Sequence, residues 1–210
     1  RYVDDIHLEG MLHAHILRSP HAHANILSID TSRASVAPGV HLILTGGDYT
    51  AANLGAMPYN NPPTPDWNPD GIYVPEQLAL ATDVVRFVGD GVAFIVADSI
   101  SNAKDAAELI EVEYQPLPSC ISTDLATNND AQSVWPERPD NIAFCHQAGD
   151  KAATDAAFEA ADIILEESFS FGRHTAVTLE PRNLIADYQA SDGMLTVYQS
   201  HQSPFQLQDG

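Results

Sequence analysis

The fold is decided by residues 84–115, which read VVRFVGDGVAFIVADSISNAKDAAELIEVEYQ. A continuous apolar run after the Gly89-Asp90-Gly91 turn is typical of a buried strand. Asp98 and Ser99 can cap a helix whose alanines recur at i, i+3 and i+4, so that they form one apolar face. The stretch therefore predicts strand–turn–strand–helix–strand, over residues 84–88, 89–91, 92–97, 100–110 and 111–114.

The preceding part of the chain predicts three more strands and a short helix. The strands cover 10–18, 21–29 and 40–44, and the helix covers 31–36, ending at Pro38-Gly39. We expect a compact β-β-α-β unit that ends in a turn at Gly46-Gly47. Residues 56–75 carry six prolines and predict an ordered surface loop anchored by Tyr59, Trp67 and Tyr73, with a disordered linker as the alternative.

The following part lacks periodicity over 119–149, which makes this segment a candidate domain boundary. Asp150 then offers a cap to a helix over 152–161. The last elements are three predicted strands, of which the second and third are joined by the turn Ala190-Ser191-Asp192-Gly193. These strands cover residues 163–171, 183–188 and 194–198.

Charge and composition exclude several classes of partner. The chain has 210 residues with 29 acidic and 9 basic side chains, a formal net charge of −20. Phosphate backbones and anionic lipid surfaces repel such a chain, so we expect neither nucleic acid nor membrane as a partner. The two cysteines, Cys120 and Cys145, are predicted to be free thiols in a reducing compartment.

Polar side chains gather after the predicted strand at 163–171. The segment 172–182 reads GRHTAVTLEPR, and its ionisable members are candidates to support a site: Arg173, His174, Glu180 and Arg182. The alternative is structural, with Glu180 and Arg182 forming an ion pair and His174 lying in the core. These residues by themselves favour the structural alternative, because ion-pair networks outnumber catalytic ones.

Four histidines could form a metal site, since residues at i and i+2 share one face of a strand. They are His13, His15, His21 and His23. No carboxylate or cysteine stands at ligand spacing nearby, so we favour surface histidines and predict no metal ligands. Gly89-x-Gly91 lacks the third glycine of a dinucleotide fingerprint, which leaves it as a tight turn.

Taken in order, the segments resemble the molybdenum-binding large subunit of the xanthine dehydrogenase, aldehyde oxidase and carbon monoxide dehydrogenase family. No single motif is decisive, but the series covers nearly the whole chain. The matching segments are residues 1–6, 17–22, 38–40, 44–46, 85–89, 103–109, 112–118, 149–150, 173–175, 179–182 and Gln202.

The resemblance implies an α+β fold in two parts. An α/β hammerhead domain is expected over residues 1–118, a linker over 119–147, and the beginning of the first molybdopterin-binding domain over 148–210. Because family subunits are several times longer, we expect this chain to be an N-terminal fragment, inactive alone. A non-catalytic hammerhead module that mediates subunit assembly is the alternative.

The resemblance also implies cofactors, partners and one cofactor contact. A molybdopterin-bound molybdenum would hydroxylate an aldehyde or aromatic heterocycle, or oxidise CO, with oxygen from water. Electrons would leave through [2Fe-2S] clusters to FAD in partner subunits of a cytoplasmic dimer of heterotrimers. Gln202, in Ser200-His201-Gln202, is the candidate donor to a molybdenum oxo ligand, although His201 replaces the usual threonine. The residues at 173–182 would support this site, and the catalytic base glutamate is expected beyond residue 210.

Overall fold

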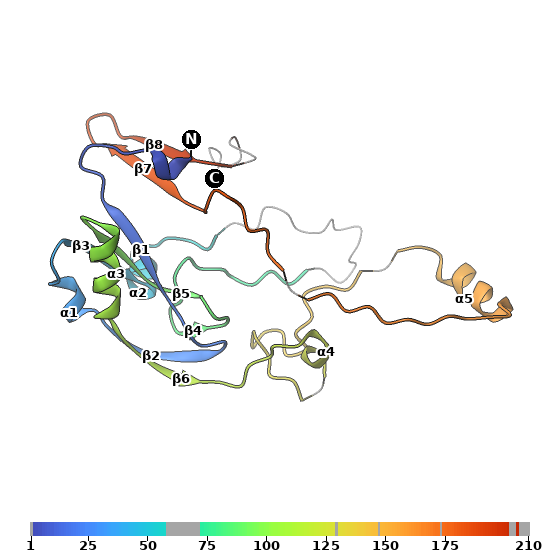
Figure 1. The fold of residues 1–210 in the computed structure, drawn as a ribbon. Helices are drawn as coiled ribbons and strands as arrows, with labels where there is room; N and C mark the ends of the chain where they lie inside the picture. The colour runs from blue at the N-terminus through green and yellow to red at the C-terminus, as the bar shows by residue number, and fades with distance from the viewer. Residues whose placement is uncertain are drawn as a thin grey trace. The chain divides into compact units, whose positions relative to one another are not determined.

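A computed structural model of the chain describes residues 2–57, 72–128, 130–146, 148–172, 174–201 and 205. The chain divides into two compact units. One is Gly10–Gln147, and the other combines Arg1–Glu9 with Ala148–Gly210. Figure 1 shows the elements of both units.

The unit Gly10–Gln147 contains two antiparallel three-stranded sheets. In the first, β5 (Gly91–Ala97) lies between β1 (His13–Arg18) and β3 (Val40–Thr45). In the second, β2 (Ala24–Asp30) lies between β4 (Val84–Val85) and β6 (Glu111–Pro116). The predicted β-β-α-β order is confirmed as β1, β2, α1 and β3, although β1 and β3 belong to one sheet and β2 to the other.

The helix α3 (Ile100–Glu108) covers the first sheet, beside α1 (Ser32–Ser35) (Figure 1). Its predicted apolar face is confirmed, because Ala103 and Ala106 are fully buried in one core cluster with Ile95 of β5. Alanine at these positions lets the helix approach the sheet closely. The strand–helix–strand pattern of 91–116 therefore supplies the main core of this unit.

Ser99 caps α3, since its side-chain oxygen accepts from the Asn102 backbone N–H at 3.1 Å. We expect Ser99→Ala to lower the free energy of unfolding by about 1 kcal/mol, because one helix-terminal N–H loses its partner. Urea denaturation of the chain measures this loss. The control Ser101→Ala, at an exposed position inside the same helix, should be neutral or slightly stabilising. Equal losses in both variants would argue against the cap.

A helix replaces the turn predicted at Gly46-Gly47. Gly46 begins α2 (Gly46–Ala51), because Asp48 accepts from the Thr45 backbone N–H at 2.8 Å and caps the first turn. Gly46 is also needed for packing, since a Cβ there would lie 2.2 Å from the backbone oxygen of Ala81. Gly46 thus serves close backbone contact rather than chain reversal.

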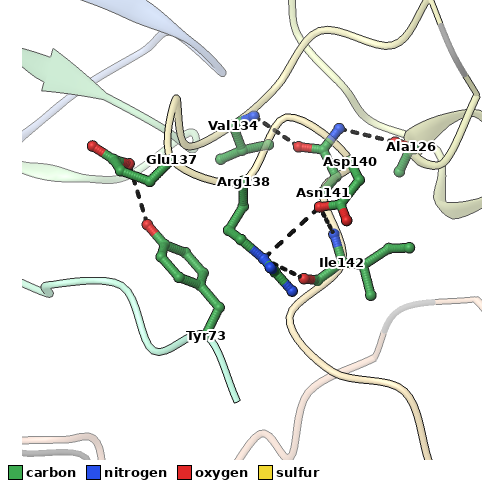
Figure 2. Close-up of polar contacts among 8 residues, drawn as sticks. All are labelled: Tyr73, Ala126, Val134, Glu137, Arg138, Asp140, Asn141 and Ile142. Carbon is green, nitrogen blue, oxygen red and sulfur yellow. Dashed lines mark hydrogen bonds and ion pairs between the residues drawn. The ribbon is translucent and has the colours of Figure 1, made fainter. Parts of the chain in front are cut away.

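An ordered loop follows the second sheet, after the short helix α4 (Thr123–Ala126). Asn141 adopts a positive φ of 56° at its centre, and its amide donates to the backbone oxygens of Ala126 and Gln132 at 2.9 and 3.1 Å. Its amide oxygen accepts from the Val134 N–H at 2.8 Å (Figure 2). One side chain therefore binds three backbone groups, and joins the end of α4 to residues 132–134 in a part of the chain whose sequence shows no periodicity.

Aromatic and guanidinium side chains brace this loop against the rest of its unit. The Tyr73 hydroxyl donates to Glu137 at 3.3 Å, and Arg138 donates to the Ile142 oxygen at 2.9 Å (Figure 2). The Arg86 guanidinium lies 3.8 Å from the ring centre of Trp135. Tyr73 is thus a confirmed anchor, whereas the rest of the proline-rich prediction, with Tyr59 and Trp67, falls mostly on 58–71, outside the described residues.

The second unit contains η1 (Val3–Asp5), α5 (Lys151–Ala160) and one hairpin. The hairpin pairs β7 (Leu184–Gln189) with β8 (Met194–Gln199), and the Gly193 N–H donates to the Gln189 oxygen at its turn. The strand predicted over 163–171 is wrong, because residues 163–171, all described, form no strand. Its alternating apolar side chains stay exposed, as at Leu165 (88%) and Phe171 (87%).

Candidate functional site

Glu180 fastens the N-terminal turn to the segment that leads into β7. Its Oε1 accepts from the backbone N–H of Val3 at 3.0 Å. The Thr178 hydroxyl donates to the Glu180 backbone oxygen at 2.6 Å. This bond holds the backbone of residues 178–180 in place. Val3 is buried, with 8% of its surface exposed. The carboxylate of Glu180 therefore holds backbone geometry.

Asn183 makes a second contact with the same turn. Its Nδ2 donates to Asp4 Oδ1, and its Oδ1 is buried without a hydrogen-bond partner in the described part of the chain. Because an ionised carboxylate can only accept, the amide nitrogen must face Asp4 and the oxygen must face away. The result is a buried acceptor held in one orientation.

The hairpin brings this region next to the chain that leads to Gln202. Leu184 pairs with Gln199 at the open end of the hairpin, so Asn183 and Ser200 are the first residues beyond that pair. The segments entering β7 and leaving β8 therefore meet at one end of a two-stranded ribbon (Figure 1). Neighbouring antiparallel strands lie about 5 Å apart.

The predicted site residues differ in what the structure says of them. Glu180 is described above, whereas Arg173 and Gln202 lie outside the described residues. His174 is exposed and its Nδ1 lies 3.1 Å from the Gly172 oxygen, so its placement in the core is wrong. No ion pair joins Glu180 to Arg182, both of which are described.

The four histidines at the start of the chain make contacts with other parts of the polypeptide. Among the described residues, no group of three or more His, Cys, Asp or Glu side chains is placed to hold a metal ion. His23 Nδ1 lies 2.8 Å from the Pro118 oxygen, and the His21 ring packs against Tyr114 with 4.8 Å between ring centres. These contacts favour the structural interpretation of the histidines.

The segment Arg18–His21 joins the turn before β5 through backbone contacts. The Ser19 N–H donates to the Asp90 oxygen at 2.8 Å, and the Gly89 N–H donates to the Ser19 oxygen at 2.8 Å. Asp90 Oδ2 accepts from the Arg86 N–H at 3.1 Å. Burial raises the pKa of Asp90 above its ordinary value, against the smaller effects of this bond and of the nearby guanidinium groups.

Asp90 gives the stability of the chain a defined pH dependence. Its folded-state pKa lies above the ordinary value of 3.8, so the carboxyl ionises more readily in the unfolded chain. Stability should fall as pH rises from about 3.8 through the folded-state pKa, and Asp90→Asn should abolish that part of the fall. Denaturation midpoints of both proteins across acid pH measure it. A constant difference at every pH would contradict this expectation.

Comparisons with known proteins identify both parts of the chain. Residues 1–118 match the family "Aldehyde oxidase and xanthine dehydrogenase, a/b hammerhead domain". The chain belongs to this family. Residues 134–210 match the "Molybdopterin cofactor-binding domain", and the predicted α+β class, hammerhead followed by the start of a cofactor-binding domain, is confirmed.

Relatives in this family are enzyme subunits of much greater length than this chain. The carbon monoxide dehydrogenase large chain of Afipia carboxidovorans is 35% identical over 97% of this chain and 25% of its own. The nicotine 6-hydroxylase large subunit of Paenarthrobacter nicotinovorans is 34% identical over 97% and 24%. The chain thus spans about a quarter of the length of these relatives.

Solved structures of the family match both units. The structure of the Cu,Mo-CO dehydrogenase in its carbon monoxide reduced state has a TM-score of 0.84 at 35% identity, covering 100% of this chain and 26% of its own. Quinoline 2-oxidoreductase from Pseudomonas putida 86 has a TM-score of 0.79 at 35% identity, covering 96% and 25%.

One side-chain atom among the described residues is suited to bind a pterin cofactor. A pterin ring carries N–H groups that need acceptors, and the buried Oδ1 of Asn183 is an acceptor with no partner in the described chain. Sequence patterns gave no sign of Asn183, because its anchor Asp4 lies 179 residues away. The cofactor-binding match includes this residue.

Proposed function

We propose that the complete protein is the large subunit of a molybdopterin-dependent hydroxylase. The match of residues 134–210 to the molybdopterin cofactor-binding domain carries this proposal. The substrate class would be aldehydes or aromatic heterocycles, or CO. For a C–H substrate, water provides the oxygen and two electrons with two protons leave the reactants. The bound molybdenum would supply the oxidising centre that accepts these electrons.

The contribution of this chain would be to position one amide beside that centre. Gln202 is the candidate cofactor contact, and the supporting residues are Arg173, His174, Glu180 and Arg182. The contact from Glu180 to the Val3 N–H and the pairing of β7 with β8 hold the polypeptide that precedes Gln202. An amide donor near a metal-bound oxygen would tune the charge there. The catalytic base would come from residues after 210.

The names of relatives support the presence of partner subunits, and the family resemblance suggests which ones. The relatives include a large chain, a large subunit and the gamma subunit of a dehydrogenase complex. From the family resemblance we infer an FAD-binding medium subunit and an iron–sulfur small subunit that carry electrons away, in a cytoplasmic dimer of heterotrimers. None of the helices in the described part of the chain is long and apolar enough to cross a membrane.

Isotope labelling tests the reaction class. The full-length complex is supplied with aldehydes, N-heterocycles and CO in water enriched in oxygen-18, with an artificial electron acceptor. Incorporation of the heavy isotope into the product of one substrate class supports the proposal. Turnover that takes its oxygen from O2 would contradict it. A complex without turnover and without cofactor would favour the non-catalytic assembly module.

A further inference from the structure

We infer that Asn183 contacts the molybdopterin cofactor, its Oδ1 accepting a hydrogen bond from a pterin N–H group. This inference rests on the proposed function and adds a second cofactor contact to it. Asn183 directly precedes β7, whereas Gln202 follows β8 in the sequence. Asn183 is the one residue in the described chain with a buried side-chain polar atom that lacks a hydrogen-bond partner. Burying such an atom without a partner lowers the stability of the folded chain, unless a ligand or another group forms a hydrogen bond with it.

The orientation of the amide is set by Asp4. Because Nδ2 donates to the Asp4 carboxylate, the side chain cannot turn over to present its nitrogen elsewhere without losing that bond. The turn that carries Asp4 is itself held, since the Tyr2 N–H donates to Asp5 at 2.7 Å and the Val3 N–H donates to Glu180. The acceptor is thus fixed before any ligand arrives.

The position of Asn183 places that acceptor at the end of the hairpin from which the chain continues to Gln202. Asn183 immediately precedes the Leu184–Gln199 pair, and Ser200 immediately follows it on the other strand. Gln202 comes two residues after Ser200, a reach of about 7 Å along an extended chain. If Gln202 makes the proposed contact, the cofactor would lie within reach of this end of the hairpin.

The test compares pterin retention in full-length complexes. Asn183→Leu removes the acceptor and the bond to Asp4, whereas Asp4→Ala removes only that bond. Released pterin is measured by its fluorescence after timed incubation. We expect Asn183→Leu to lose the pterin roughly fivefold faster than wild type, the effect of one hydrogen bond. Asp4→Ala should lose it at a rate between those of wild type and Asn183→Leu, because the amide keeps its acceptor but loses the bond that orients it. Asn183→Ala is carried through the same comparison, in case the leucine variant does not assemble.

A thermal measurement separates a cofactor donor from a donor elsewhere in the polypeptide. Asn183→Leu should lower the Tm of the loaded complex more than that of the complex made in cells that cannot synthesise the pterin. Equal lowering in both forms, equal pterin loss in Asn183→Leu and Asp4→Ala, or no change in retention would each overturn the inference. The matched control Asn25→Ala, which removes an exposed bond to Gln115 in the other unit, should retain pterin normally. A wild-type complex that holds no pterin would instead refute the proposed function itself.

Discussion

Replacing Gln202 by alanine in the full-length enzyme is expected to lower kcat roughly 10- to 100-fold, the usual cost of losing a group that orients or polarises a metal's ligands. The amide would donate to a metal-bound oxygen whose charge changes during the reaction. Its removal should therefore slow turnover more than it weakens substrate binding, and leave the fold intact. Steady-state kinetics together with molybdenum content measure this effect.

The matched control for this experiment is Gln199→Ala. Gln199 is an exposed glutamine at the end of β8, three residues before Gln202, and its backbone pairs with Leu184. Its side chain has no proposed role, so kcat should stay near the wild-type value. Full activity of Gln202→Ala, with the wild-type molybdenum content, would refute the assignment of Gln202 to the cofactor.

Replacing Ile95 by alanine is expected to lower the free energy of unfolding by about 2–5 kcal/mol. Ile95 is fully buried in β5 and is among the largest fully buried side chains of the described core. Its neighbours on the adjacent strands are His15 and Ile43, and α3 lies over this sheet. The truncation would leave a cavity that two strands and a helix cannot fill.

Urea denaturation of the chain measures this loss of stability. The control Val36→Ala removes apolar atoms from a side chain that is 83% exposed, and should change the free energy of unfolding by less than about 0.5 kcal/mol. Similar losses in the two variants would contradict the placement of the core under α3.

The elements that the sequence predicted well are those with a local cause. Ser99 and Asp150 each cap a helix through their own side chains, and the alternation in β7 and β8 surrounds a turn with glycine at positive φ. The strand predicted over 163–171 has the same alternation, yet no neighbouring strand pairs with it among the described residues. A strand needs a partner, and periodicity alone does not provide one.

The candidate site was only partly predictable for a related reason. Glu180 stood out as an ionisable residue, but its partner, the Val3 N–H, lies 177 residues away in sequence. No sequence pattern predicts a role for Asn183, because the burial of its side-chain oxygen depends on the folded chain. The role of Gln202 came from family resemblance alone and stays a prediction.

The measurement that tests the central claim most directly is the molybdenum and pterin content of the full-length protein, purified with its partner subunits from cells supplied with molybdate. We predict molybdenum and pterin in equal amounts, each stoichiometric with the large subunit. Protein that assembles with its partners but contains neither molybdenum nor pterin would contradict the assignment of this chain to a molybdopterin-dependent hydroxylase.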